Sequence, residues 1–224
     1  MPKVKRLNLS MEDLPPFRPP YLLGGSVLAI VGFWQCAIEA RRGLGALLLS
    51  HYQEPPPELP VRYHEVIGAR VRWARGSIVA EPFAMVLDAE LPVELGKLHY
   101  GLPKRFETGL QVRTTADGGR CESGAALQLD WAAYPAWRQT LGLPLRLGGE
   151  LALRLFTRTV DIRGIGPPVT CARIALRPQT RPRWVSISQV RLDGCSLRPL
   201  VGLFFRHVTT ELGAPHACAM EAHG

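Results

Sequence analysis

The stretch His99-Tyr100-Gly101-Leu102-Pro103-Lys104-Arg105-Phe106 places one lysine directly after a Gly-x-Pro turn, next to an arginine and between apolar residues. The chain has only four lysines against 23 arginines. Arginine stays protonated in proteins, whereas a lysine amine loses its proton when it is desolvated or lies beside another cation. A neutral amine attacks ketones and forms a Schiff base. Lys104 is therefore the candidate nucleophile, and Arg105 is the candidate cation that favours its neutral form.

A carboxylate in an apolar pattern is the second candidate. Residues 61–72 alternate as a strand does, which puts Val61, Tyr63, Glu65 and Ile67 on one face. A carboxylate on the apolar face of a strand is costly unless it is paired, so Glu65 is a candidate site residue. In the alternative register, Glu65 faces solvent and has no such role.

Both segments resemble motifs of the acetoacetate decarboxylase family. Gly101-Leu102-Pro103-Lys104-Arg105 is similar to the family's Gly-x-Pro-Lys-Lys signature, whose first lysine forms the Schiff base. Tyr63-His64-Glu65-Val66-Ile67 resembles the family's segment that supplies an acidic group, and the apolar stretch 45–52 lies where members have a strand. The resemblance covers residues 20–110. It implies catalytic roles for Lys104, Glu65 and Arg105.

The chain departs from the family pattern in three places. Arg105 replaces a second lysine, which keeps the charge but not the compact ammonium group. Residues 68–77 contain no counterpart of the family's second glutamate. Phe33-Trp34-Gln35 stands where members carry an arginine. Tyr63, His99 and Tyr100 remain as the predicted substrate-binding residues.

Composition and patterning predict a mainly β fold. Glycine and proline make up close to a fifth of the 224 residues, which favours short strands and many turns. The resemblance implies an acetoacetate decarboxylase-like barrel, and the strand patterns predict about eight to ten strands with a few short helices. Residues 1–20 are predicted to form an extended N-terminal arm and residues 21–224 a single barrel-like domain.

Three segments are predicted to be helical. Residues 35–44 have a two-faced pattern, and residues 89–98 follow Asp88, a suitable N-cap. Residues 197–212 have apolar side chains at helical spacing. A short helical cap is also expected within 134–143, and a strand over 150–163.

The net charge and the spacing of the cysteines allow predictions about the binding partners and the cellular location of the protein. The net charge of +8 comes from arginines spread along the chain, so we expect neither a nucleic-acid nor a membrane partner. No metal-ligand spacing is present, and no metal or other cofactor is expected. The five cysteines lie far apart without a Cys-x-x-Cys pair, which predicts free thiols and a cytoplasmic protein. We also expect a homo-oligomer and a small keto substrate.

Three functions from different classes fit the sequence. The first is a Schiff-base enzyme, a carbon–carbon lyase that decarboxylates a β-keto acid or performs aldol or dehydration chemistry on a related keto or polyketide-like substrate. The second is a cyclase or isomerase on the same scaffold that uses acid–base groups without a covalent intermediate. The third is a protein that binds an apolar ligand without reacting.

Overall fold

The computed structural model describes residues 19–57, 59–74, 77–115, 117–135, 160–165 and 170–217. These residues form thirteen strands of one sheet, one α-helix and one turn of 3-10 helix at Glu39–Arg41. The mainly β prediction is confirmed, with more strands than the eight to ten expected. The elements are β1 (Tyr21–Gln35), β2 (Gly43–Glu54), β3 (Tyr63–Ala74), β4 (Ser77–Leu87), α1 (Glu90–Tyr100), β5 (Lys104–Phe106), β6 (Gln111–Thr115), β7 (Gly118–Ser123), β8 (Leu127–Ala133), β9 (Val160–Arg163), β10 (Thr170–Pro178), β11 (Arg183–Leu192), β12 (Cys195–Leu212) and β13 (His216–Ala217).

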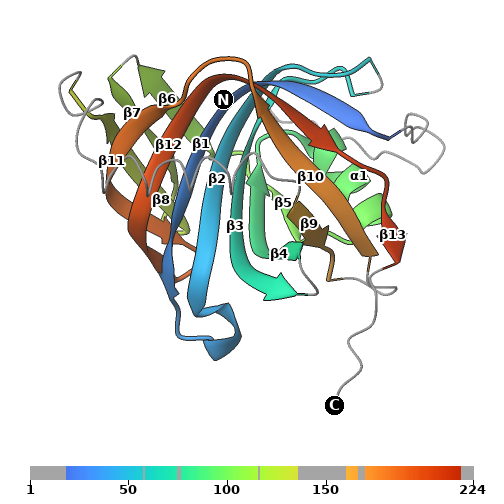
Figure 1. The fold of residues 1–224 in the computed structure, drawn as a ribbon, viewed down its shortest axis with the longest axis horizontal. Helices are drawn as coiled ribbons and strands as arrows, with labels where there is room; N and C mark the ends of the chain where they lie inside the picture. The colour runs from blue at the N-terminus through green and yellow to red at the C-terminus, as the bar shows by residue number, and fades with distance from the viewer. Residues whose placement is uncertain are drawn as a thin grey trace.

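Seven of the strands close into a barrel. The pairing runs β10–β9–β4–β3–β2–β1–β12, and β12 returns to β10 through the register pairs from Ile174↔Leu212 to Pro178↔Val208. Helix α1 lies next to β5 and β10, at the end of the barrel where β1 begins (Figure 1). Alternate residues of each strand point into the barrel. Most of these inward-pointing side chains are apolar, so the interior is an apolar core.

The remaining long strands extend the sheet beyond the barrel. Strands β11, β8, β7 and β6 continue from β12 and pack over the outer face of β1 to β4. The cluster between them contains Trp34, Leu47, Val66, Leu129 and Leu192. The sheet therefore has two apolar faces along β1 to β4, one inside the barrel and one beneath the second layer.

The expected helix at 197–212 is wrong, because these residues form the 18-residue strand β12. This strand pairs with β1 over nearly its whole length, and at two irregularities it carries an extra residue opposite β1. Each extra residue interrupts the period of two and produces apolar spacings of three and four. The apolar spacing in this segment is therefore that of a helix, although the segment is a strand.

The other two helix predictions differ in outcome. Residues 35–44 contain only the 3-10 turn, because β1 extends to Gln35 and β2 starts at Gly43. Helix α1 is confirmed, but its N-cap is Ala89, without a side-chain hydrogen bond. The carboxylate of Asp88 instead accepts hydrogen bonds from His64, so its predicted capping role is wrong.

The expectation of free cysteines is also wrong. Cys36, directly after β1, forms a disulfide with Cys195, the first residue of β12, and Cys171 is disulfide-bonded as well. Among the described cysteines only Cys121 is a free thiol, and it is buried. Disulfides persist in oxidising compartments. The cysteines therefore no longer support the expected cytoplasmic location.

Several predictions lie outside the described residues. These are the N-terminal arm up to residue 18, most of the helical cap at 134–143 and the part of the expected strand before Val160. The described end of the expected strand is β9 (Val160–Arg163). Ile162 is buried, and Asp161 points to the opposite face of the sheet.

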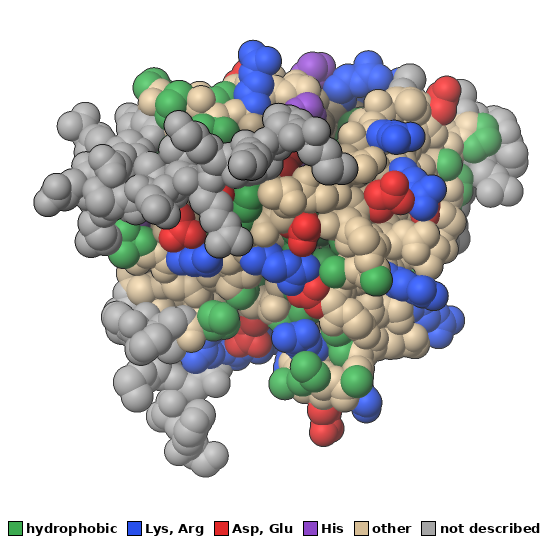
Figure 2. Space-filling view, turned by 180° about the vertical axis from the view of Figure 1, so that it is seen from behind, with side chains coloured by type: hydrophobic (Ala, Val, Ile, Leu, Met, Phe, Trp, Pro, Cys, Tyr) green, Lys and Arg blue, Asp and Glu red, His purple; other side chains and the backbone are tan. Residues whose placement is uncertain are grey.

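Charged side chains of both signs are mixed on the molecular surface. Figure 2 shows acidic side chains interspersed with basic ones on the face opposite to that of Figure 1. The net charge of +8 is therefore not concentrated on this face. Within the described residues, no helix combines the length and the apolar character that crossing a membrane requires.

Candidate active site

The end of helix α1 places Lys104. Gly101 ends the helix in the left-handed conformation (φ 60°), with its N–H bonded to the carbonyl of Lys97 at 3.1 Å. This 5→1 bond from a left-handed glycine is the αL form of helix termination, and the N–H of Leu102 also bonds to the carbonyl of Gly96. Pro103 then stops the helix from continuing, and Lys104 starts β5 in parallel pairing with Met85 of β4. The Gly-x-Pro-Lys sequence is thus a helix-to-strand turn that sets the lysine at one end of the barrel.

Lys104 and Glu65 form a buried ion pair. Nζ of Lys104 lies 2.8 Å from Oε1 of Glu65, and the two residues are 8% and 4% exposed. Glu65 is therefore on the inner face of β3, as the alternation predicted, and the solvent-facing register is wrong. Oε1 has no hydrogen bond of good geometry, so the ammonium group is its main compensation for burial.

Tyrosine and hydroxyl side chains surround the pair. Tyr63 and Tyr52 lie on paired positions of β3 and β2 with their ring centroids 4.9 Å apart. Burial raises the pKa of both phenols, and the neighbouring Glu65 carboxylate raises it further. Ser50, the register partner of Glu65, and Thr210 lie beside the Tyr52 hydroxyl. These phenols therefore remain neutral hydrogen-bonding groups beside the carboxylate.

A small pocket exposes the lysine. Its volume is about 30 Å³, and it is lined by residues of β1, α1 and β12 together with Tyr63 and Lys104. Gly96 of α1 provides the room for the lysine side chain, since a Cβ there would overlap Cδ of Lys104. Of the described residues that line this pocket, Lys104 alone carries a charge.

The structure does not bring Arg105 to the pair. Consecutive strand residues point to opposite faces, and the Arg105 guanidinium donates two hydrogen bonds to Asp193, at 2.5 and 2.6 Å. Asp193 lies in the turn between β11 and β12. Arg105 therefore connects β5 to the second layer and is already paired with a carboxylate.

The predicted substrate-binding residues have different positions. Tyr63 and Tyr100 line the pocket, but the Tyr100 hydroxyl donates to the carbonyl of Gly213 at 3.1 Å. His99 is on α1 and does not line the pocket, and partial burial lowers its pKa. The structure thus brings together Lys104, Glu65, Tyr63 and the ring of Tyr100.

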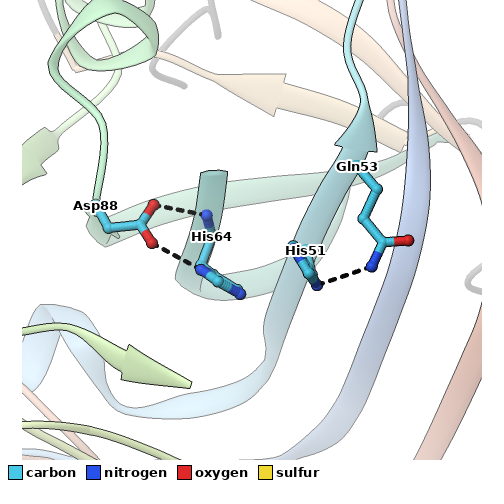
Figure 3. A network of polar contacts seen from close by, with 4 residues as sticks. All are labelled: His51, Gln53, His64 and Asp88. Carbon is cyan, nitrogen blue, oxygen red and sulfur yellow. Dashed lines mark hydrogen bonds and ion pairs between the residues drawn. The ribbon is translucent and has the colours of Figure 1, made fainter. Parts of the chain in front are cut away.

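A pair of contacts connects β3 to the residue that follows β4. The backbone N–H of His64 donates to Oδ1 of Asp88 at 2.7 Å, and Nδ1 of its ring lies 2.7 Å from Oδ2 (Figure 3). The ring also stacks on His51, whose other neighbour is the Gln53 amide. Because His64 stands between Tyr63 and Glu65, this contact fixes the part of β3 that carries both side chains.

The sequence pattern did not single out Ser50, Tyr52 and Gly96. Ser50 and Tyr52 continue the face of β2 that carries Leu48, and this period of two was a usable signal. Gly96 lies within a helix, where only the three-dimensional contact reveals its role. Among the described residues, no group of three or more His, Cys, Asp or Glu side chains is placed to hold a metal ion.

A buried amine next to a carboxylate supports proton transfer and covalent catalysis. Moving one proton along the 2.8 Å contact converts the charged pair into a neutral amine and a neutral carboxylic acid.

Comparison with solved structures identifies similar folds. An acetoacetate decarboxylase from Legionella pneumophila subsp. pneumophila str. Philadelphia 1 matches 98% of this chain and 92% of its own, with a TM-score of 0.63 and 12% identity. An acetoacetate decarboxylase-like enzyme from Sphingomonas wittichii RW1 matches 90% and 93%, with a TM-score of 0.55 and 12% identity. The enduracididine biosynthesis enzyme MppR, with HEPES bound, matches 95% and 93%, with a TM-score of 0.53 and 10% identity.

Sequence comparison adds no relative. No family model matches the chain. No curated protein matches it either. The likeness is thus one of three-dimensional structure, and it spans nearly the whole chain. The protein has the fold of acetoacetate decarboxylase and of the enzymes that resemble it.

Proposed function

We propose that this protein is a Schiff-base-forming enzyme, a carbon–carbon lyase that acts on a β-keto acid through Lys104. The observation that carries the proposal is the buried contact between the only charged pocket-lining residue described and Glu65, at 2.8 Å. In acetoacetate decarboxylase a lysine is activated beside another cationic group, and its covalent mechanism is carried over to this chain by analogy. In this chain Glu65, and not Arg105, is the direct neighbour.

The chemistry follows from the pair. Lys104 gives a proton to Glu65, and its neutral amine adds to the keto carbon of the substrate. One proton of the attacking nitrogen moves to the former carbonyl oxygen and gives a carbinolamine. Glu65 then returns its proton to this hydroxyl group, which leaves as water, and an iminium ion remains. The carboxylate then leaves as carbon dioxide, and its bonding electrons pass to the iminium nitrogen. Protonation of the enamine carbon and hydrolysis release the ketone and restore Lys104.

The same iminium supports aldol-type bond formation. One structure of MppR contains the condensation product of pyruvate and imidazole 4-carboxaldehyde, and another contains pyruvate. This chain lacks a counterpart of the second glutamate between 68 and 77. Decarboxylation is the leading reaction, and aldol or dehydration chemistry is the alternative on the same intermediate.

Borohydride trapping tests the proposal. Reduction in the presence of 3-oxobutanoate or pyruvate should alkylate Lys104, and the peptide that contains it should gain the mass of the keto compound less one oxygen, or that of the decarboxylated ketone less one oxygen after loss of carbon dioxide. Lys104→Ala should abolish the adduct and the turnover. Lys97→Ala is the matched control, because Lys97 lies on the exposed side of α1 and pairs with Glu94. Full turnover in Lys104→Ala without any adduct would exclude covalent catalysis.

A non-covalent acid–base enzyme is the second candidate, because the amine of Lys104 is paired with the carboxylate of Glu65. A cyclase or isomerase of this kind needs the carboxylate more than the amine. Glu65→Gln should then reduce turnover more than Lys104→Ala does. The covalent mechanism predicts the opposite order.

A further inference from the structure

A second and much larger cavity occupies the other end of the barrel. Its volume is about 310 Å³, and it lies toward the hairpin that joins β3 to β4. Its wall is built from inward-facing apolar residues of six strands: Val31, Leu48, Ile67, Ala80, Ile162 and Leu176. Arg72 is the only charged side chain among the described lining residues, and it pairs with Glu81. The cavity therefore suits an apolar ligand.

The cavity opens to solvent at an apolar rim. Leu44 and Trp73 line it and are 43% and 62% exposed. Exposed aromatic and aliphatic side chains around a concave site are typical of ligand entry. The described chain begins at the opposite end of β1, beside the lysine pocket.

The inner end of the cavity reaches the row of residues that holds Lys104. Ile67, Met85 and Lys104 are consecutive register partners across β3, β4 and β5. Neighbouring strands lie about 4.8 Å apart, so the Cα atoms of Ile67 and Lys104 are roughly 10 Å apart. Ile67 and Met85 also belong to the same buried cluster as Tyr52 and Tyr63, so apolar side chains connect the cavity to the ion pair.

The space beside the lysine is too small for a substrate. A volume of about 30 Å³ is enough for only one or two water molecules. Any larger keto compound must place its remaining atoms elsewhere, and the 310 Å³ cavity is the larger apolar space in the described barrel. Met85, flexible at its thioether, stands between the two spaces in the register.

We propose that the cavity binds the alkyl chain of the substrate, so that the enzyme acts on β-keto acids with a medium-length apolar chain. This inference rests on the proposed function for the position of the keto group at Lys104. An apolar cavity of about 150 Å³ takes up benzene, so a cavity about twice as large accommodates a chain of about ten carbons. The chain enters past Leu44 and Trp73, and the keto acid head passes between Ile67 and Met85.

Binding of n-alkanols tests the cavity without Schiff-base chemistry. By calorimetry, affinity should rise about fourfold for each added methylene from butanol to about decanol. Ala46→Phe places a ring in the cavity wall and should weaken decanol binding by at least tenfold. Ala132→Phe, on an exposed position of β8, is the matched control and should leave the affinity unchanged. Circular dichroism checks folding, and Ala80→Leu serves as a second cavity-filling variant.

Turnover of 3-oxo acids from four to ten carbons tests the link to Lys104. Ala46→Phe should raise KM for 3-oxodecanoate at least tenfold, whereas Ala132→Phe should leave kcat and KM for both 3-oxobutanoate and 3-oxodecanoate within twofold. Alkanol binding with the expected slope, but no borohydride adduct at Lys104, would keep the cavity site and remove the proposed function. An adduct with 3-oxobutanoate, but no dependence on chain length or on Ala46→Phe, would overturn the cavity inference alone.

Discussion

The contact between Lys104 and Glu65 determines both the chemistry and the local stability of the barrel interior. Each charge alone would be expensive to bury, and Oε1 of Glu65 has no other described partner of good geometry. Lys104→Met removes the cation and leaves the carboxylate unpaired. We expect the free energy of unfolding to fall by about 3–5 kcal/mol.

A double variant distinguishes the cost of leaving one charge unpaired from the cost of removing both charges. Glu65→Gln combined with Lys104→Met replaces two charges with neutral side chains of similar size. We expect it to recover most of the stability lost in Lys104→Met, because no unpaired charge remains. Denaturant unfolding at neutral pH measures both variants against the wild-type protein. If Lys104→Met and the double variant were equally stable, the Glu65 carboxylate would not cost stability when its lysine partner is absent.

Gly96 controls the position of the lysine side chain. A Cβ at this position would overlap Cδ of Lys104 and lie 2.5 Å from Cε. These atoms belong to a flexible side chain, so Gly96→Ala should displace Lys104 rather than unfold α1. We expect at least a tenfold slower borohydride trapping with unchanged helical circular dichroism. Gly109→Ala is the matched control, because its nearest atom is 3.4 Å away.

The sequence singled out Lys104, Glu65 and Tyr63, which the structure brings together, but it did not single out Ser50, Tyr52 or Gly96 around them. Glu65 was found through the period of two in β3, and Lys104 through its turn motif. Arg105 lies next to Lys104 in the sequence but on the other face of the strand. Its partner, Asp193, is 88 residues away. Such a contact depends on the packing of two layers and leaves no local pattern.

At the scale of elements, the Arg105–Asp193 contact attaches β5 to the turn between β11 and β12. A partly exposed pair of this kind contributes about 1 kcal/mol. Arg105→Gln should lower the free energy of unfolding by about that amount and leave the pH profile of trapping at Lys104 unchanged. Arg206→Gln, at an exposed position of β12, is the control. A shifted pH profile would instead show that Arg105 acts on the lysine.

The contact between His64 and Asp88 attaches the start of β3 to the segment before α1 (Figure 3). Asp88→Ala removes the acceptor of two hydrogen bonds that are about a quarter exposed. We expect a loss of about 1–2 kcal/mol in unfolding free energy, together with slower trapping, since Tyr63 and Glu65 flank His64.

Gln53→Ala is the control for this prediction, because the Gln53 amide contacts the exposed side of His51. It should change neither unfolding nor trapping. A stable Asp88→Ala protein with unchanged trapping would show that other contacts position β3.

Strands with a regular alternation were predicted from the sequence, and strands with irregularities were not. Strand β3 kept its period of two around Glu65 and was predicted correctly. Strand β12 carries two extra residues opposite β1, and its apolar spacing therefore resembled that of a helix. Local patterns identify regular strands, whereas irregular strands are identified by their partners.

At the scale of the whole molecule, the barrel closes through pairs that are distant in the sequence. Strand β12 pairs with β1, β11 and β10, and its two halves belong to different layers. Composition predicted a β-rich fold, and the family resemblance implied a barrel, but neither could reveal the second layer of β6, β7, β8 and β11. That layer depends on pairing across the chain and on the apolar outer face of β1 to β4.

The disulfide between Cys36 and Cys195 fixes the ends of β1 and β12 where the two layers meet. It connects residues separated by 159 positions, directly beyond the register pair Gln35↔Ser196. A crosslink over so long a loop restricts the unfolded chain and stabilises the fold by about 2–4 kcal/mol. The double variant Cys36→Ala with Cys195→Ala should lose that amount in denaturant unfolding, and the wild-type protein unfolded in reductant should lose at least as much, because reductant also opens the disulfide of Cys171.

Cys121 supplies the control for this prediction. Burial, and then the nearby Asp88, raise the pKa of Cys121 to about 12, so at pH 8 it remains a neutral thiol. Only a thiolate attacks a disulfide, so Cys121 should not exchange with Cys36 or Cys195 in the native protein. Cys121→Ala should therefore keep the disulfide and most of the stability. An intact mass showing free thiols at Cys36 and Cys195 in oxidised protein would contradict the crosslink, and the double variant Cys36→Ala with Cys195→Ala would then leave the unfolding midpoint unchanged.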